Sequence, residues 1–448
     1  MLRKRMLVVL TVLALSLPVA ISAEEAEGGF DFGLNLGIGA DSFYIDDTIG
    51  YVTYQKLTVA PDIAFGKFGI GLELTLHYTF TDEAGVDPIR VEGDWIPDPA
   101  LGQNYLDVYL PKFKYIRYGF KGDPLFVKLG SIEDGTLGNG FIMNNYDNTL
   151  FLPERRIFGL AFDLDGALFN FPYLGLETFV GNVARFDVLG ARLYARPLAG
   201  TEVPLLKNLQ VGATFAMDSD PGLHDPTLVD PDLVYLYGAD LRQPILASQA
   251  ISLAAFTDIA VLGNQSAVGG MVGFGGRIAG IILYGAQIRV LGENFVPVYF
   301  DSTYDLFRAD KYAVASGAVT VPNYTGWLAS LGFSLFGDLL VFNASLDGPF
   351  TSGQDPLNYL DWPHLYAQLT LSKGLIPNVS LDFSYDKRNL GADRGFFRDM
   401  FGADSVIRGR LNYSIGAAVL SLVYDIRYDP TRDKWVTHSG IESAIDLF

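Results

Sequence analysis

The sequence predicts an all-β protein, a transmembrane antiparallel β-barrel of about 20 strands, with about 18 or 16 as alternatives. The prediction starts from Lys67–Phe80, KFGIGLELTLHYTF, in which every even position is apolar and every odd position is small or polar. A period of two is typical of a strand, because successive side chains point to opposite faces. Soluble strands average about 5–6 residues, whereas a tilted strand needs roughly 9–11 to cross a bilayer. Alternation over 14 residues therefore favours a membrane-crossing strand.

Two further observations extend this prediction to the whole chain. Hydrophobic residues make up 49% of the sequence, yet beyond the N-terminal segment no apolar run reaches the roughly 18 residues of a transmembrane helix. Alternating strands produce this composition without long apolar runs. From Gly280 onward, tight turns and long polar loops also alternate between the strands, which is the layout of barrels with short periplasmic turns and long extracellular loops.

Residues 1–23 match a secretory signal peptide. Arg3–Arg5 form a charged region, Met6–Ala20 is apolar, and Ile21–Ala23 offers a small-residue cleavage site. A membrane anchor is the alternative, but the apolar stretch is short and carries Pro18. We therefore expect cleavage after residue 23 and a single barrel domain over residues 24–448.

The alternating stretches are predicted as strands in chain order. Phe30–Gly39 begins the pattern close to the signal peptide, which leaves no room for an N-terminal plug domain. Asn104–Gly119 contains Pro111, which predicts a bulge within that strand. The full set comprises Phe30–Gly39, Tyr51–Phe65, Lys67–Phe80, Asn104–Gly119, Leu125–Gly130, Arg155–Asp165, Phe171–Val180, Phe186–Arg196, Lys207–Met217, Asp232–Arg242, Gln249–Val261, Val268–Ile278, Ile281–Leu291, Tyr324–Leu335, Asp338–Asp347, Trp362–Lys373, Pro377–Lys387, Ser405–Gly416, Ala418–Tyr428 and Trp435–Phe448.

Ser131–Glu154 is an unusual connecting segment. It is rich in Gly and Asn but also carries buried-type residues such as Phe141, Ile142 and Met143. Such a segment is expected to pack on a surface. The sequence leaves open whether that surface is the inner wall of a wide barrel or whether the segment forms an ordered external loop.

The apolar set of each strand marks its lipid face, so the other parity marks the lumen. In Ser405–Gly416, for example, Leu411 and Ile415 face lipid while Arg408 and Arg410 face inward. An Arg or Lys on the lipid side near the midplane would cost roughly 2–4 kcal/mol. The observed charges follow this parity, which supports the assignment.

The predicted inward charges are balanced in sign. A barrel of about 16–18 strands leaves an aqueous channel, so these residues are predicted to line a hydrated pore whose field sorts solutes. The other interpretation is a network of paired charges that braces the wall. The predicted pore-lining residues are Glu73, Arg155, Asp163, Glu177, Arg192, Arg196, Asp240, Arg242, Asp258, Arg277, Arg289, Asp382, Asp386, Arg408, Arg410, Asp425 and Arg427, with Asp31 on the same face.

The sequence offers little for catalysis or cofactor binding. It has no cysteine and four histidines, and we find no phosphate-binding loop or calcium-loop spacing. His77 shares the lumen face with Glu73, but without a nucleophile or metal spacing a solvated pair is the better interpretation. Without the three basic residues of the signal, 29 basic residues face 51 acidic ones, a net charge of −22, which disfavours a nucleic-acid partner. We expect no enzymatic activity, cofactor or metal site.

Taken together, the signal peptide, the early first strand, the alternation of turns and loops and the terminal Phe448 make the chain resemble Gram-negative outer-membrane porins. The resemblance implies a bacterial outer-membrane location, contact with membrane lipid and a lipopolysaccharide-type outer leaflet, and recognition of the C-terminal strand by the barrel assembly machinery. It also allows a homo-oligomer. Phe448 departs from the pattern, since it is out of phase with Ile441, Ile445 and Leu447.

The porin resemblance also implies an inward constriction loop that bears acidic residues. By analogy Ser131–Glu154 is the candidate, although the family's usual loop sequence is absent. The candidate constriction residues are Glu133, Asp134, Asp147 and Glu154.

These features predict an outer-membrane channel for passive diffusion of small polar solutes or ions. A hydrophobic-substrate transporter of the fatty-acid type is one alternative, but the early first strand leaves no room for that family's N-terminal hatch. A surface adhesin is the other alternative, which the long external loops permit.

Overall fold

The computed structural model describes residues 29–45, 48–81, 85–99, 102–152, 155–203, 205–223, 225, 228–248, 250–351, 363–392, 395–402, 404–416, 418–429 and 434–446. The predicted signal peptide 1–23, the loop residue Glu154 and the terminal Phe448 lie outside these residues and stay predictions.

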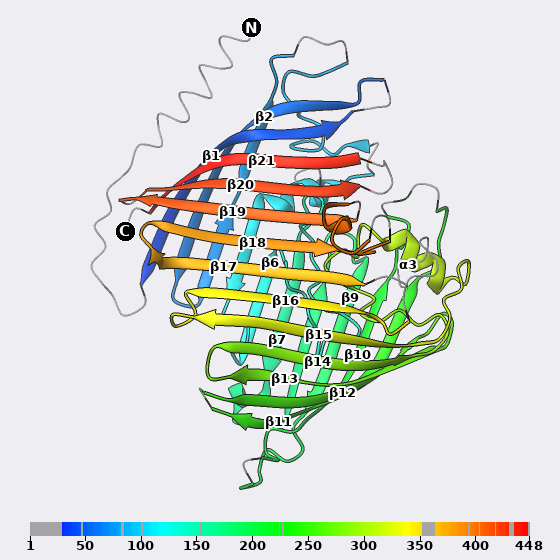
Figure 1. The fold of residues 1–448 in the computed structure, drawn as a ribbon. Helices are drawn as coiled ribbons and strands as arrows, with labels where there is room; N and C mark the ends of the chain where they lie inside the picture. The colour runs from blue at the N-terminus through cyan, green and yellow to red at the C-terminus, as the bar shows by residue number, and fades with distance from the viewer. Residues whose placement is uncertain are drawn as a thin grey trace.

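The described strands form one antiparallel sheet that closes into a barrel (Figure 1). β1 (Phe30–Tyr44) pairs on one side with β2 (Tyr51–Phe65) and on the other with β21 (Lys434–Asp446). β3 (Phe68–Leu72) and β4 (Leu74–Tyr78) both pair with β2 and are two parts of one passage. The 21 labelled strands therefore make 20 positions around the barrel, which confirms the predicted fold class and strand number.

The remaining strands follow in chain order, and each predicted stretch coincides with or overlaps an observed strand. They are β5 (Phe113–Tyr118), β6 (Leu125–Gly130), β7 (Gly159–Asp165), β8 (Leu174–Val180), β9 (Val188–Ala195), β10 (Gln210–Asp218), β11 (Val234–Ala247), β12 (Ser252–Leu262), β13 (Ala267–Ile278), β14 (Ile282–Leu291), β15 (Tyr324–Leu335), β16 (Leu340–Pro349), β17 (His364–Ile376), β18 (Val379–Lys387), β19 (Ser405–Ile415) and β20 (Ala418–Asp429).

The two ends of the barrel differ in their connections, as the sequence predicts. At one end, here the turn end, short turns join strand pairs such as β2–β3, β15–β16 and β19–β20. Gly66 and Gly416 sit in two of these turns at φ +55° and +61°, a conformation that glycine adopts without steric cost. The opposite end, here the loop end, carries the long connections, including residues 79–112, 131–158 and 292–323.

Among the described residues, two short helices and three 3-10 turns interrupt the connections. The helices are α2 (Tyr105–Tyr109) and α3 (Arg308–Ala315), and the 3-10 turns are Leu110–Lys112, Gly166–Phe169 and Asp399–Phe401. The prediction of one bulged strand over Asn104–Gly119 is wrong in its first half. Asn104 and Asp107 form a capping box that begins α2 instead, because each side chain bonds a backbone N–H that a strand would present to a neighbour. Among the described residues, no helix has the length and apolar character needed to cross a membrane.

The outer face of the barrel is apolar. Large side chains such as Val290 and Leu331 are 64% and 65% exposed at outward positions of β14 and β15. In β19, Leu411, Tyr413 and Ile415 are exposed as predicted. An outward-facing apolar band around a closed β-barrel is the arrangement of membrane-spanning barrels, so the strands form a membrane-spanning wall.

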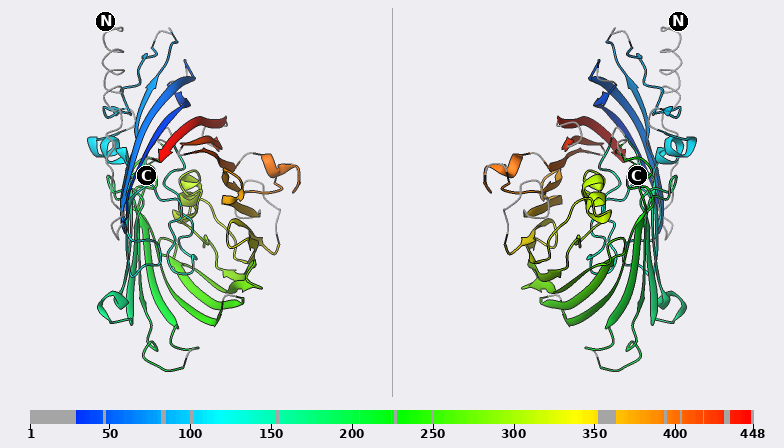
Figure 2. Two further views of the ribbon diagram at one scale, coloured as in Figure 1. Left: turned by 90° about the vertical axis from the view of Figure 1, so that its left-hand side faces the viewer. Right: turned by 90° about the vertical axis from the view of Figure 1, so that its right-hand side faces the viewer.

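Part of the lumen is filled by two inward-folded segments, residues 131–152 and 292–323, here called the first and second inner segments. Figure 2 shows α3 and these connections inside the ring of strands. Phe141 of the first segment stacks on Phe295 of the second, with ring centroids 5.5 Å apart. Their apolar residues form one core with inward side chains of β6–β14, including Phe179 and Leu236. The apolar side chains of the described residues 131–152 thus pack on the inner wall.

Candidate functional site

The first inner segment is held against the wall by backbone and amide contacts. The Gly138 N–H donates to Glu177 Oε2 at 3.0 Å, and Asn139 Nδ2 donates to Asp258 Oδ1 at 2.8 Å. Small wall residues make room for the core. A Cβ on Gly269 would lie 2.3 Å from the ring of Phe295, so only glycine permits this approach. Gly269 therefore serves packing of the second inner segment, whereas Gly273 and Gly276 of the same stretch lie close to neighbouring wall strands.

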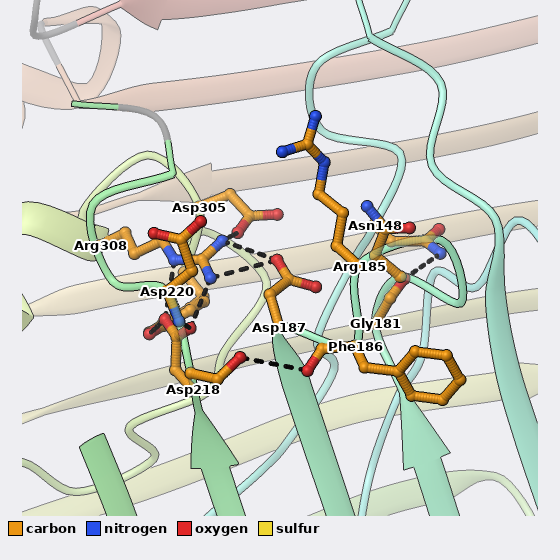
Figure 3. Close-up of polar contacts among 12 residues, drawn as sticks. Asn148, Gly181, Arg185, Phe186, Asp187, Asp218, Asp220, Asp305 and Arg308 are labelled. Carbon is orange, nitrogen blue, oxygen red and sulfur yellow. Dashed lines mark hydrogen bonds and ion pairs between the residues drawn. The ribbon is translucent and has the colours of Figure 1, made fainter. Parts of the chain in front are cut away.

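The second inner segment is anchored by a buried arginine. Arg308 at the start of α3 lies between three aspartates (Figure 3). Its Nη2 is 2.6 Å from Asp218 Oδ1 and 3.1 Å from Asp187 Oδ2, and its Nη1 is 3.3 Å from Asp305 Oδ1. Because all four side chains are buried, removing one partner would leave uncompensated charge in the interior.

A second buried cation, Lys311, braces the same segment internally, and Arg388 joins it to the opposite wall. Lys311 Nζ donates to the carbonyl oxygen of Tyr299 at 2.7 Å and to Asp301. Arg388, which follows β18, also bonds Asp301, and its Nε donates to Thr303 Oγ1 at 2.7 Å. The second inner segment is thus tied to β9 and β10 on one side and to β18 on the other.

The inner segments leave open a polar cavity of about 520 Å³ in the lumen. It lies between the inner faces of β1–β5 and β17–β21 and the polar side of the inner segments. Among the described residues its charged lining comprises Lys56, Lys114, Arg156, Arg408 and Arg410 against Glu73, Glu133, Asp147, Asp382, Asp386 and Asp425. Hydroxyl and amide groups fill the spaces between these charges, including Thr58, Tyr366, Gln368 and Ser384.

Several lining charges are paired across the cavity wall. Arg156 pairs with Glu73, and Arg408 pairs with Asp147. Lys56 Nζ lies 3.1 Å from His438 Nε2 and 3.7 Å from Asp41. Glu133 is enclosed by the barrel although its side chain stays open to the cavity, and burial raises its pKa, with the Asp147 carboxylate raising it further. The lining is therefore a mixed field of both signs.

The structure brings together part of the predicted site. Six predicted pore-lining residues line the cavity, namely Glu73, Asp382, Asp386, Arg408, Arg410 and Asp425, together with the loop candidates Glu133 and Asp147. Arg427 lies beside it, over the ring of Phe151 at 5.0 Å. Asp134 instead lines a smaller space of about 360 Å³ on the other side of the first inner segment, where Asp163 pairs with Lys121 at 2.7 Å.

The other predicted residues are inward but do not line the large cavity. Glu177, Arg192, Asp240 and Asp258 lie beneath the first inner segment, with Arg192 Nη2 2.6 Å from Asp240. Arg289 pairs with Asp347 at 2.9 Å. Towards the turn end, Arg196 pairs with Asp165 at 2.6 Å, Arg277 with Asp338 at 3.4 Å, and Arg242 lies opposite Gln210. For Arg192, Arg196, Arg277 and Arg289, each paired with a carboxylate, the alternative interpretation of a wall braced by paired charges describes the contacts better.

The arginine that faces the cavity just before β7 is the neighbour of the predicted Arg155. Arg155 was assigned from a strand over Arg155–Asp165, but β7 begins only at Gly159. The parity of the strand therefore does not extend to this residue. Its neighbour Arg156 faces the cavity and pairs with Glu73.

Sequence reasoning also missed Lys56, Lys114 and His438. The signal was present for Lys56, because Leu57, Val59 and Ile63 mark the other face of β2 as apolar. On β21, His438 lies on the same face as the buried Val436, whereas Trp435 and Ile441 are exposed on the other face. Lys114 follows the turn after α2, which the sequence did not reveal, so its parity was not accessible.

Comparison with known proteins shows similarity to solved barrels only. No protein-family model matches the chain, and no curated protein matches it. Acinetobacter baumannii OccAB4 is 10% identical with a TM-score of 0.35, covering 94% of this chain and 98% of that chain. Pseudomonas aeruginosa OccK11 (OpdR) is 13% identical with a TM-score of 0.34, covering 93% and 95%. Pseudomonas aeruginosa OpdK with vanillate is 10% identical with a TM-score of 0.34, covering 93% and 97%. Similarity at these values carries no argument about function, so the site is interpreted from this chain's own residues.

Proposed function

We propose that the protein is a porin-like channel of a bacterial outer membrane, through which small polar solutes or ions diffuse passively. The observation that carries this proposal is the polar cavity enclosed by a barrel whose outer face is apolar. Spanning β-barrels with polar interiors are the architecture of outer-membrane channels. Hydroxyl, amide and charged groups along the lumen replace water contacts for a polar solute.

The two inner segments set the size of the proposed path. An empty barrel of more than about 16–18 strands would leave a wide aqueous channel. Here the apolar core of the inner segments occupies the side of the lumen next to β6–β14. The remaining path passes the cavity, whose volume of about 520 Å³ suits small solutes rather than folded or polymeric ones.

The charges of the cavity favour solutes of mixed or neutral character. Five cationic side chains stand against six acidic ones, with His438 beside them. Because opposite charges lie close together, their fields largely cancel at the scale of a whole solute. We therefore expect weak preference between small cations and anions.

The alternatives receive less support from the described residues. A fatty-acid-type transporter needs an apolar path, but the open part of the lumen is polar and the apolar part is packed. No observation favours an adhesin. Cleavage after residue 23, recognition of the C-terminal strand by the assembly machinery and a homo-oligomeric state stay predictions from the sequence.

The test is single-channel recording of the purified, folded protein in planar bilayers, with the reversal potential measured under a salt gradient. Folding is checked first by heat-modifiable electrophoretic mobility. Steady unitary steps with a reversal potential near zero are expected. A folded barrel that inserts but never conducts would overturn the channel proposal.

A further inference from the structure

The barrel wall is incomplete on the far side of β4. Among the described strands, β4 pairs only with β2, and β5 pairs with β3. Residues 79–112, here called the β4–β5 insertion, supply the missing backbone partners. The Glu73 N–H donates to the carbonyl oxygen of Lys112 at 2.8 Å, and the Arg90 N–H donates to that of His77 at 3.1 Å.

The neighbouring strands on this side are also short. β5 and β6 have 6 residues each, and β7 and β8 have 7, whereas β12 has 11 and β15 has 12. At about 3.3 Å per residue, six residues span about 20 Å even without tilt. That is less than the apolar band of about 25 Å on an outer-membrane barrel. The regular sheet therefore leaves part of the band uncovered towards the loop end.

The β4–β5 insertion places α2 over this part of the wall. Figure 2 shows the cyan helix outside the strands, on the side of the wall away from the lumen. Asp107 of α2 is 3.2 Å from Arg185 in the β8–β9 connection, which ties the helix to the barrel. On the lumen side of the same region lie Glu73 and Arg156, two charged residues of the polar cavity.

The outward side of α2 is apolar and aromatic. Tyr105, Leu106 and Tyr109 are 66%, 54% and 48% exposed, whereas Val108 on the opposite side is buried. Tyr105 and Tyr109 stack with ring centroids 6.3 Å apart, as expected for side chains four positions apart on one helix face. Phe186, next to Arg185 in the β8–β9 connection, is also exposed.

We propose that the outward face of α2 binds membrane lipid at the interface of the outer leaflet and completes the apolar band where the strands fall short. Tyr105 suits this position, because a tyrosine ring is apolar and its hydroxyl can reach the headgroups. Tyr109 adds an apolar ring, while its hydroxyl donates to the Trp95 carbonyl oxygen at 3.1 Å. The occupant is lipid because this face is continuous with the lipid-facing wall, and because a charged cavity lies directly behind it. The inference does not depend on whether the barrel conducts.

The test uses the absence of native cysteine. Leu106→Cys is labelled with an environment-sensitive fluorophore, the protein is reconstituted in phosphatidylcholine vesicles, and quenching by nitroxide lipids is measured. Leu331→Cys on the outer face of β15 is the lipid-exposed control, and Ala318→Cys in the connection after α3 is the water-exposed control. We expect blue-shifted emission and at least about half the quenching at position 106 that position 331 shows.

Two outcomes would overturn the proposal. Water-like emission at position 106 without lipid quenching would place α2 in solvent. Emission shielded from both water and lipid would place α2 against protein, for example against a second copy of the chain. Crosslinking of the vesicle-bound protein would then identify that contact. A second site, Tyr109→Cys, repeats the measurement in case labelling at position 106 disturbs the helix.

Discussion

Arg408 is the residue at which opposite charges of the cavity meet, since it pairs with Asp147 and lies beside Asp425 in the register of β19 and β20. Arg408→Gln would remove one cation of the lining. A unit charge about 8 Å from a passing ion in water changes its energy by about 0.5 kcal/mol. The change favours a cation and disfavours an anion by this amount, and screening over a Debye length of about 10 Å at about 0.1 M salt reduces each effect by more than half. We therefore expect the cation-to-anion permeability ratio to rise about twofold.

The matched control for this prediction is Arg277→Gln. Arg277 pairs with Asp338 near the turn end and does not line the cavity. Reversal potentials under a salt gradient should shift for Arg408→Gln and stay within error for Arg277→Gln. Equal shifts in the two variants would mean that the cavity does not govern selectivity.

Asp305 predicts a pH dependence of the second inner segment. Burial raises the pKa of this carboxyl to about 7, and the Asp187 and Asp218 carboxylates add to the rise while Arg308 opposes it. Unfolded aspartate titrates near about 4. Between pH about 4 and about 7, the folded segment thus holds a proton on Asp305 that the unfolded segment has released. The stability of the folded segment should therefore fall as the pH rises through this range.

Hydrogen exchange of residues 299–308, corrected for intrinsic rates, should be slower at pH 5 than at pH 8 if this assignment is right. Asp305→Asn resembles the protonated carboxyl and should lose most of the difference. The Asp134→Asn variant, outside the anchor, serves as the control. Equal protection of the wild-type segment at both pH values would contradict the assignment.

At the residue scale, strand parity was informative only where the strand itself was placed correctly. It assigned Arg408, Arg410 and Asp425 to the lumen, because β19 and β20 alternate without interruption. It failed at Arg155, where the strand was extended by four residues beyond its true start at Gly159. Pairing was inaccessible, since which charges meet depends on contacts between segments far apart in the chain.

At the element scale, the two inner segments differ in how clearly their sequences predict packing on a surface. The apolar residues of the first one, such as Phe141 and Met143, stood out against its Gly and Asn content. The second carries a comparable signal in Phe295, Tyr299 and Phe300, but it lies among the connections after Gly280 that the turn and loop pattern predicts as long polar loops. Whether either segment folds into the lumen depends on the stacking of Phe141 on Phe295. A local sequence pattern does not predict this contact, because the two residues lie far apart in the chain.

Arg308 should control the position of the second inner segment. Arg308→Leu would leave three buried aspartates without their cation, and breaking a buried pair costs about 3–5 kcal/mol. Because the strand ladders do not involve this side chain, we expect the barrel to remain folded while the segment detaches. Unitary conductance should rise, and protease should cleave within residues 292–323.

The control for this prediction is Arg308→Lys, which keeps one charge and should restore part of the protection. Heat-modifiable mobility reports on the barrel itself. If Arg308→Leu stays as resistant to protease as the wild type, the apolar core alone holds the segment and the ion pairs are dispensable.

At the scale of the whole molecule, the closed barrel followed from the sequence because alternation and turn placement are local properties repeated along the chain. The division of the lumen did not. It requires wall positions such as Gly190 and Gly269 to meet Leu137 and Phe295 from segments that enter from the loop end. The wall defect beside β4 was missed for a related reason, since the capping box of α2 lay inside an apparently alternating stretch.

The division of the lumen makes a final prediction about the route of solutes. Ser384 points from β18 into the polar cavity, so Ser384→Trp would place an indole in the proposed path. Leu331→Trp adds the same ring on the lipid face and is the matched control. We expect unitary conductance to fall by at least about half in Ser384→Trp and to stay unchanged in Leu331→Trp, because a pore's conductance depends on its narrowest hydrated section. Unchanged conductance in a correctly folded Ser384→Trp barrel would mean that solutes cross elsewhere. The part of the lumen that the inner segments fill would then have to open.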